Sequence, residues 1–410
     1  MRKRLLAMLL SALLGFSACA APTPAEPTRL TVVGTSAVPQ TTTAAPIHTT
    51  SQTSTTEAPR TTTSFTTPRT TFAAATTPAA TSVQTVRYED VEARFSVMTP
   101  EEKVGQLFCV SLSDSDTLTD TDEALLRDCH FGNIILFSAN IRSAAQLAAL
   151  TASLMDAVSA DTGIPPFIAV DQEGGNVMRL LDAAAAPPAM AVGSTGDPGL
   201  AWRLGELMGA QLRTLGINVD FAPVADVNSN PDNPVIGARS YSEDPAATAA
   251  FVSSFTQGLQ SSGVLACVKH FPGHGDTDLD SHTDLPEVTK DRASLEKTEL
   301  VPFRAGIAAG AAMTMVGHIL YPALGAEDVP ASLSEAVIEG VLRDELGFSG
   351  LVVTDSLSMG AVTDTWGEAE ACVMAVNAGA DLLCVNDSAE ALRTDYEAVL
   401  QAVQIGRAHV

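Results

Sequence analysis

Basic side chains are scarce in this sequence of 410 residues. It has 23 lysines and arginines against 48 aspartates and glutamates, which gives a formal net charge of −25 at pH 7. Aromatic residues make up only 5%, and no stretch interleaves them with basic residues. Because such a chain would repel a polyanion, we expect no nucleic-acid partner.

Two further absences narrow the chemistry. No two of the six cysteines are spaced as CxxC: Cys109, Cys267 and Cys384 lie in apolar runs, and Cys129 and Cys372 lie in predicted helices. Apolar surroundings are typical of structural cysteines, so we predict neither a disulfide framework nor a zinc site. No GxGxxG motif follows the first apolar run, so a dinucleotide-binding fold has no support.

The first 85 residues are predicted to be an export signal and a linker. MRKRLLAMLLSALLGFSACA has a basic head, an apolar run too short to span a membrane, and small residues before Cys19. FSAC resembles the lipobox of bacterial lipoproteins, although Phe16 replaces the usual leucine. We therefore predict that residues 1–19 are a lipoprotein signal and that Cys19 is lipidated, which would anchor the protein to the membrane outside the cytoplasm. The alternative is an ordinary secretory signal and a secreted protein.

Residues 20–85 are rich in Thr, Pro and Ala and contain few large apolar side chains. Such a composition cannot repay the entropy of folding, so we predict a disordered linker. At the other end of the chain, QIGRAHV (404–410) resembles a translated sequencing adapter. We expect these seven residues to be a non-native tail that replaces a missing C-terminus.

Residues 86–403 repeat a unit of an apolar run, a polar loop and a helical pattern. Helical patterns such as 143–160 and 201–216 separate most of the apolar runs. The eight runs are VGQLFCV (104–110), GNIILF (132–137), PFIAV (166–170), VDFAPVA (219–225), VLACVKH (264–270), AMTMVGHI (312–319), LVVTD (351–355) and DLLCV (381–385). Continuous apolar runs suit parallel strands that are buried on both faces. Eight such units predict a (β/α)8 TIM-like barrel, with an open doubly wound sheet as the alternative.

The unusual polar residues favour the barrel. DQEGG follows the third run, KHFPGHG closes the fifth, His318 ends the sixth, and TDSLSM ends the seventh. In a barrel these loops all meet at the face formed by the carboxyl ends of the strands, where active sites lie.

Residues 269–286 read KHFPGHGDTDLDSHTDLP and hold three of the seven histidines. His270 and His274 are spaced like zinc ligands on a helix, but Pro272 and its flanking glycines exclude a helix there. Acidic residues also match positions 1, 3, 5 and 12 of a calcium loop. That loop needs glycine at position 6, where Ser281 stands, so a calcium-stabilised adhesion module is only an alternative.

Proton transfer explains the segment better. Asp280 and His282, two residues apart in an extended loop, are able to pair, and a carboxylate beside an imidazole makes a general acid/base. Asp355, at the end of the seventh run, is a candidate nucleophile, or else a helix N-cap. Asp171 in VDQEGG has the same two interpretations.

Three cations stand close to these groups in the predicted loops. Arg179, Arg239 and Lys269 are able to bind polar substrate groups, or they neutralise nearby carboxylates. The residue types alone leave both interpretations open.

From about Thr99 to Val403 the chain resembles bacterial β-N-acetylhexosaminidases of glycoside hydrolase family 3. VDQEGGNVMRL, FAPVADVN, KHFPGHGDTDLDSH and TDSLSM occur in the order of that family. The resemblance implies that the nucleophile is Asp355, that His282 is the acid/base and that Asp280 orients it. It also implies that the sugar is bound by Asp171, Arg179, Arg239, Lys269 and His270, and that His274 braces the loop.

The resemblance implies a retaining exo-β-N-acetylglucosaminidase acting on N-acetylglucosamine in peptidoglycan fragments or other glycans, without metal or cofactor. We expect a monomer. Two departures are Ser356, where the family often has a second aspartate, and the short C-terminus. The alternatives are a family 3 β-glucosidase and an inactive glycan-binding surface lipoprotein.

Overall fold

The computed structural model describes residues 88–180 and 186–409. The predicted signal peptide, its Cys19 and the predicted linker lie outside the described residues. No helix in the described ranges is both long and apolar enough to cross a membrane.

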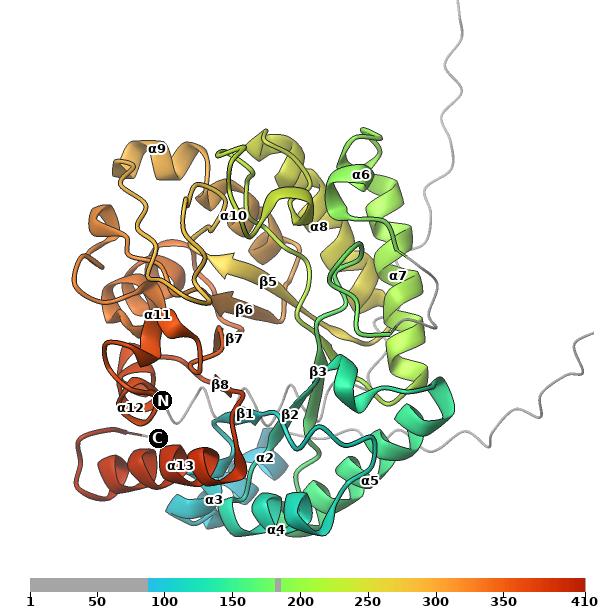
Figure 1. The fold of residues 1–410 in the computed structure, drawn as a ribbon, viewed down its shortest axis with the longest axis vertical. Coiled ribbons are helices and arrows are strands. Elements are labelled where there is room, and N and C mark those ends of the chain that lie inside the picture. The colour runs from blue at the N-terminus through green and yellow to red at the C-terminus, as the bar shows by residue number, and fades with distance from the viewer. Residues whose placement is uncertain (1–87, 181–185, 410) are drawn as a thin grey trace, which may run out of the picture. The chain divides into compact units, whose positions relative to one another are not determined.

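Eight parallel strands form one sheet in the order β7-β6-β5-β4-β3-β2-β1-β8. The strands are β1 (Phe108–Val110), β2 (Asn133–Leu136), β3 (Phe167–Val170), β4 (Val219–Asp220), β5 (Leu265–Phe271), β6 (Met313–Val316), β7 (Leu351–Thr354) and β8 (Leu383–Val385). β8 pairs with β1 in register, and a parallel bridge from Val353 to Leu382 joins β7 to β8. The sheet therefore closes on itself, and the predicted TIM-like barrel is confirmed (Figure 1).

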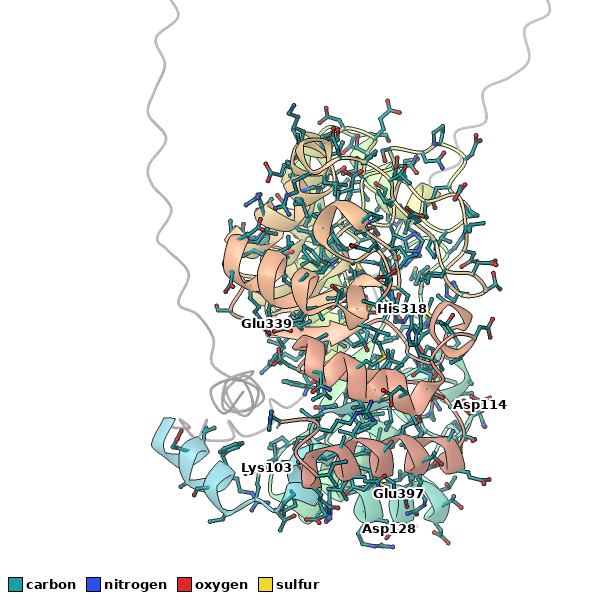
Figure 2. All side chains as sticks on the ribbon, turned by 90° about the vertical axis from the view of Figure 1, so that its left-hand side faces the viewer. Lys103, Asp114, Asp128, His318, Glu339 and Glu397 are labelled. Atoms are coloured by element: carbon teal, nitrogen blue, oxygen red, sulfur yellow. The ribbon has the colours of Figure 1, made fainter. Side chains whose placement is uncertain are left out.

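Helices form the outer layer of the barrel (Figure 1). They are α2 (Tyr88–Val97), α3 (Pro100–Gly105), α4 (Asp120–Cys129), α5 (Ala144–Thr162), α6 (Ala189–Gly193), α7 (Pro198–Thr214), α8 (Pro245–Ser261), α9 (Arg292–Lys297), α10 (Leu300–Ala308), η5 (Ala336–Glu345), α11 (Gly360–Thr363), α12 (Glu368–Ala378) and α13 (Ala389–Gln404). Four short 3₁₀ turns are η1 (Ser138–Asn140), η2 (Gly237–Arg239), η3 (Pro322–Leu324) and η4 (Ala331–Leu333). Figure 2 shows charged side chains such as Asp128 of α4 and Glu397 of α13 on the outer surface.

Local sequence signals explain where several helices begin. Asp197 and Asp244 cap α7 and α8 by accepting backbone N–H groups, and each is followed by a proline at the first helical position. Proline suits that position because its missing N–H would have no helical partner there. These two helices pack closely, since a Cβ atom at Gly258 of α8 would lie 2.0 Å from the Trp202 carbonyl oxygen of α7.

All strand residues are buried except Leu265, which is partly buried. Each predicted apolar run coincides with one strand, but β5 extends one residue past its run, to Phe271, and the first run was too long at its start. Val104 and Gly105 belong to α3, because the capping box of Thr99 and Glu102 begins a helix there. At the other end, α13 ends at Gln404 and Ala408 is buried, while the origin of residues 404–410 stays a prediction.

Candidate active site

A cavity of about 420 Å³ opens at the carboxyl ends of the strands. Seven of the predicted site residues line it: Asp171, Arg179, Arg239, Lys269, His270, His282 and Asp355. Lys269 and His270 belong to the end of β5, and the others come from the loops after β3, β4, β5 and β7, so segments up to 184 positions apart in the sequence meet here. Asp280 reaches the site through His282, to which it is hydrogen-bonded.

Asp355 follows β7 directly and is partly exposed. Its N–H donates to the Val316 carbonyl oxygen at 2.9 Å, and its Oδ1 accepts the Ser356 N–H at 2.8 Å. Burial raises the pKa of Asp355, but His270, His318 and the Ser356 N–H outweigh it, so the pKa lies below its ordinary value. The carboxylate is therefore ionised at neutral pH, as a nucleophile must be.

His318, labelled in Figure 2, supports the peptide that follows Asp355. Its Nε2 lies 2.8 Å from the Ser356 carbonyl oxygen, and its Nδ1 lies 2.7 Å from Ser332 Oγ. Because a carbonyl oxygen only accepts, Nε2 carries the proton and Nδ1 accepts from Ser332. Burial lowers the pKa of His318, which keeps the ring neutral.

Asp280 and His282 form the predicted pair in the loop after β5. Asp280 Oδ1 lies 2.6 Å from His282 Nδ1 and also accepts the His282 N–H at 2.9 Å. The side chain of His282 is 63% exposed, and that of Asp280 is 43% exposed. Burial slightly opposes ionisation of Asp280, but the hydrogen bonds from His282 leave its pKa lowered. The carboxylate thus holds Nδ1–H and leaves Nε2 for proton exchange.

Buried contacts hold the rest of this loop. His274 bonds through its two ring nitrogens to Thr277 Oγ1 at 2.8 Å and Ser281 Oγ at 2.9 Å. Burial, with His270 nearby, lowers the pKa of His274 to about 4, so it is neutral at pH 7. Gly360 N–H donates to the His282 carbonyl oxygen at 3.1 Å, which ties the loop to α11. His274 therefore lies where a bracing residue is needed.

Lys269 is the centre of a buried ion-pair network in the wall of the cavity. Its Nζ lies 2.7 Å from both Asp171 Oδ1 and Glu173 Oε1. Arg239 binds Glu173 with two hydrogen bonds, from Nε at 2.9 Å and Nη2 at 2.8 Å. Burial lowers the pKa of Lys269, but Asp171 and Glu173 outweigh it and raise the pKa above its ordinary value. This part of the cavity wall therefore carries both cations and anions, which present donors and acceptors for hydroxyl groups.

Arg179 is held more loosely than Arg239. Its Nη2 is 3.3 Å from Asp171 Oδ2, and its guanidinium lies over the Phe137 ring at 5.5 Å from the centroid. Arg179 also lines a larger cavity of about 540 Å³ beside α5 and α7. The described lining of that cavity has no histidine and no carboxylate, whereas the smaller cavity contains the candidate acid/base groups.

His270 is buried beside Asp226, with Nδ1 2.8 Å from Asp226 Oδ2. Its Nε2 lies 3.3 Å from Arg239 Nη2. Sequence reasoning assigned no role to Asp226 or Glu173, although both lie in segments that it singled out. The second carboxylate of the DQEGG segment was a usable signal for Glu173, whereas nothing local links Asp226 to His270.

Two of the four acidic residues of the calcium-loop pattern pair with basic side chains of the protein. Asp276 pairs with Lys290 at 2.8 Å, and Asp280 pairs with His282. Within residues 88–180 and 186–409, no group of three or more His, Cys, Asp or Glu side chains is arranged to hold a metal ion. The calcium alternative therefore has no converging ligand set here.

Comparison with known proteins gives a consistent result. The glycosyl hydrolase family 3 N-terminal domain matches residues 99–410. A β-hexosaminidase A from Pseudoalteromonas piscicida is 39% identical over 284 residues, which cover 65% of this chain and 47% of that protein. A β-hexosaminidase from Xylella fastidiosa is 39% identical over 277 residues, which cover 66% of this chain and 80% of that protein.

A solved family 3 β-N-acetylglucosaminidase from Paenibacillus sp. has a similar fold, with a TM-score of 0.74 and 44% identity. The alignment covers 76% of this chain and 59% of that one. This chain therefore spans only about half of the first relative and less than two thirds of this solved structure.

Proposed function

The chain belongs to glycosyl hydrolase family 3, and from this premise we propose that it is a retaining exo-β-N-acetylglucosaminidase. The observation that carries the proposal is the combination of an ionised Asp355 with the Asp280–His282 pair at one cavity. Retaining glycosidases need a nucleophile and a separate acid/base, and here the histidine takes the place of the second carboxylate.

The proposed mechanism gives each group a role. Protonated His282 donates to the leaving oxygen while Asp355 attacks the anomeric carbon, which breaks the glycosidic bond and forms a glycosyl ester. Neutral His282 then accepts a proton from water, and that water cleaves the ester with net retention of configuration. Asp280 stabilises the imidazolium that forms in the second step.

The polar wall supports a sugar as the substrate. Cationic donors and anionic acceptors line the cavity. The donors are Lys269 and Arg239, the acceptor is Asp171, and His270 lies in the same lining. Sugar hydroxyls both donate and accept, so they match such a wall. The relatives described above are β-hexosaminidases and a β-N-acetylglucosaminidase, which favours N-acetylglucosamine as the sugar. Peptidoglycan fragments or other glycans are the proposed sources. A β-glucosidase is the alternative within the family, but those enzymes usually take their acid/base from a second domain.

The test is hydrolysis of p-nitrophenyl β-N-acetylglucosaminide by the full chain, beside the matching β-glucoside. We expect release from the N-acetyl sugar and at most slow release from the glucoside. A preference for glucose would keep the barrel and the nucleophile but would reject the substrate assignment. No release from either compound, by protein shown to be folded, would favour a glycan-binding surface protein.

We also propose that the protein is anchored outside the cytoplasm through a lipid on Cys19. The signal-like residues 1–19 and the FSAC segment support this proposal. Expression with radiolabelled palmitate in a bacterial host is the test, with Cys19→Ala as the matched control. Label in the parent protein and none in the variant is expected, whereas equal label in both would reject the anchor.

A further inference from the structure

Asp226 lies at the back of the sugar-facing wall and is completely buried. Its Oδ1 accepts the His274 N–H at 2.6 Å and the His270 N–H at 3.2 Å. Its Oδ2 lies 2.8 Å from His270 Nδ1. Burial raises the pKa of Asp226, but His270 and the N–H groups outweigh it and lower the pKa, so the group is a carboxylate.

These contacts determine where His270 carries its proton. A carboxylate only accepts, so Nδ1 carries a hydrogen and donates it to Asp226. On the other side of the ring, Arg239 Nη2 lies 3.3 Å from Nε2. An arginine only donates, so Nε2 is a bare acceptor. His270 is therefore a neutral ring whose acceptor nitrogen lies beside an arginine donor at the cavity wall.

A hydroxyl group placed beside these two atoms, on the cavity side, is able to bridge them. It donates its hydrogen to His270 Nε2 and accepts one from Arg239 Nη2 through its oxygen. The 3.3 Å separation is long for a hydrogen bond, so little is lost when a hydroxyl takes over both partners. In the other tautomer, Nε2–H and Arg239 would both be donors, and the hydroxyl hydrogen would have no acceptor there.

We propose that Asp226 is a positioning residue, which holds His270 in the Nδ1–H tautomer so that His270 and Arg239 together select one sugar hydroxyl. This inference rests on the proposed function, because it takes the substrate to be a sugar. It assigns to Asp226 a part in substrate recognition without any contact with the substrate.

Asp226→Asn is the sharpest variant because it keeps the size of the side chain. Three donors point at Asp226: the His274 N–H, the His270 N–H and the His270 Nδ1–H. An asparagine has one oxygen and one NH₂ group, so it cannot accept all three. With its oxygen on the two backbone N–H groups, its NH₂ faces Nδ1, which accepts only if the proton moves to Nε2.

The first measurement is the tautomer of His270, from the ¹⁵N shifts of its ring nitrogens, with His270→Gln used to assign the signals. We expect Nδ1–H in the parent protein and Nε2–H in Asp226→Asn. A parent ring with its proton on Nε2 would overturn the proposal. This measurement needs no activity, so it stands apart from a failure of the proposed function, and the parent tautomer alone is able to overturn the proposal even if the variant does not fold.

The second measurement uses 3-, 4- and 6-deoxy p-nitrophenyl β-N-acetylglucosaminides. We expect Asp226→Asn to lower kcat/KM for the full sugar about 10- to 100-fold, mainly through KM, as for a buried donor left unpaired. For one deoxy sugar, which lacks the selected hydroxyl, parent and variant should differ less than about twofold. Equal losses on all the sugars would show a merely structural role and would overturn the proposal.

Asp122→Asn is the matched control for this series. Asp122 is also buried, and it accepts hydrogen bonds from Ser113 and Thr119 at the start of α4, away from the cavity residues. Its substitution should lower stability without changing the His270 tautomer or the ranking of the deoxy sugars. If Asp122→Asn changed that ranking as Asp226→Asn does, the proposal would be rejected.

Discussion

The histidines of two histidine–carboxylate pairs lie within residues 269–286, yet the two pairs differ in exposure and in sequence separation. His270 and Asp226 are 7% and 0% exposed, and Asp226 lies 44 positions away in the sequence. His282 and Asp280 are 63% and 43% exposed and lie two positions apart. In both pairs Nδ1 lies within 2.8 Å of a carboxylate oxygen, so the local hydrogen-bond chemistry is the same.

The difference lies in what each ring can do with its other nitrogen. The buried ring faces Arg239 Nη2, a donor, so its Nε2 is placed as an acceptor. The exposed ring is open to solvent, so its Nε2 is able to gain and lose a proton during a reaction. In the proposed function the buried pair therefore serves recognition, and the exposed pair serves as the acid/base.

The largest expected effect comes from the proposed nucleophile, which lies in the same cavity as both histidines. Asp355→Ala should lower kcat about 10⁴-fold or more, because in the proposed mechanism this carboxylate forms the glycosyl ester. Steady-state hydrolysis of the p-nitrophenyl N-acetylglucosaminide measures it, with Asp364→Asn on the exposed end of α11 as the control. A loss below tenfold would mean that neither pair serves a covalent mechanism.

The next effect tests the exposed pair alone. His282→Ala should lower the rate about 10²- to 10⁴-fold for an alkyl glycoside, whose leaving group needs a proton. A p-nitrophenyl glycoside should lose less in the first step, because its leaving oxygen needs little protonation. The melting temperature should stay nearly unchanged, since the side chain is mostly exposed. Equal and negligible losses with both substrates would remove His282 from the mechanism.

For protein stability we expect the larger loss from the buried pair and the smaller loss from the exposed pair. Asp226→Ala leaves three buried donors without their acceptor, so it should cost about 3 kcal/mol of unfolding free energy. Asp280→Ala, at an exposed loop position, should cost within about 0.5 kcal/mol. Urea unfolding of the two variants beside the parent protein gives both values. Similar costs would erase the distinction between a buried and an exposed pair.

The same contrast explains what the sequence was able to predict. Asp280 and His282 are two residues apart, so their pairing was predicted from the sequence alone. Asp226 and His270 meet only because β4 and β5 are neighbours in the barrel, and no local pattern encodes that contact. Long-range polar pairs of this kind can be identified only when the arrangement of the strands in the closed sheet is known.

The fold was easier to predict from the sequence than the site, because buried parallel strands appear in a sequence as continuous apolar runs. Each of the eight runs coincides with a strand to within a few residues, and the helices predicted at 143–160 and 201–216 correspond to α5 and α7. The error at Val104 and Gly105 arose because those apolar residues are buried on a short helix, and burial alone does not distinguish helix from strand. The Glu173 contacts depended in the same way on three-dimensional neighbours.

A third carboxylate, which is buried without a histidine, sharpens the comparison further. Asp395 of α13 is 2% exposed, and its Oδ2 has no hydrogen-bond partner among the described residues. Burial, with Glu368 and Asp387 nearby, raises its pKa to about 7 from an ordinary value of 3.8. Asp226 shows the opposite direction, a lowered pKa, so its donors account for the difference.

The raised pKa of Asp395 gives the smallest expected effect and a definite sign. Between about pH 4 and pH 7 the folded protein holds a proton that the unfolded chain has released, so stability falls as the pH rises through this window. Asp395→Asn removes the titration, and it should be about as stable as the parent at pH 4. At pH 8 it should be about 1–2 kcal/mol more stable, which is less than the full shift because solvent screens the charge. Urea unfolding at both pH values measures the gain, with Asp364→Asn as the exposed control. A gain that is the same at pH 4 and pH 8 would show that Asp395 does not titrate in this range, and a buried carboxylate would then need no partner to stay ionised.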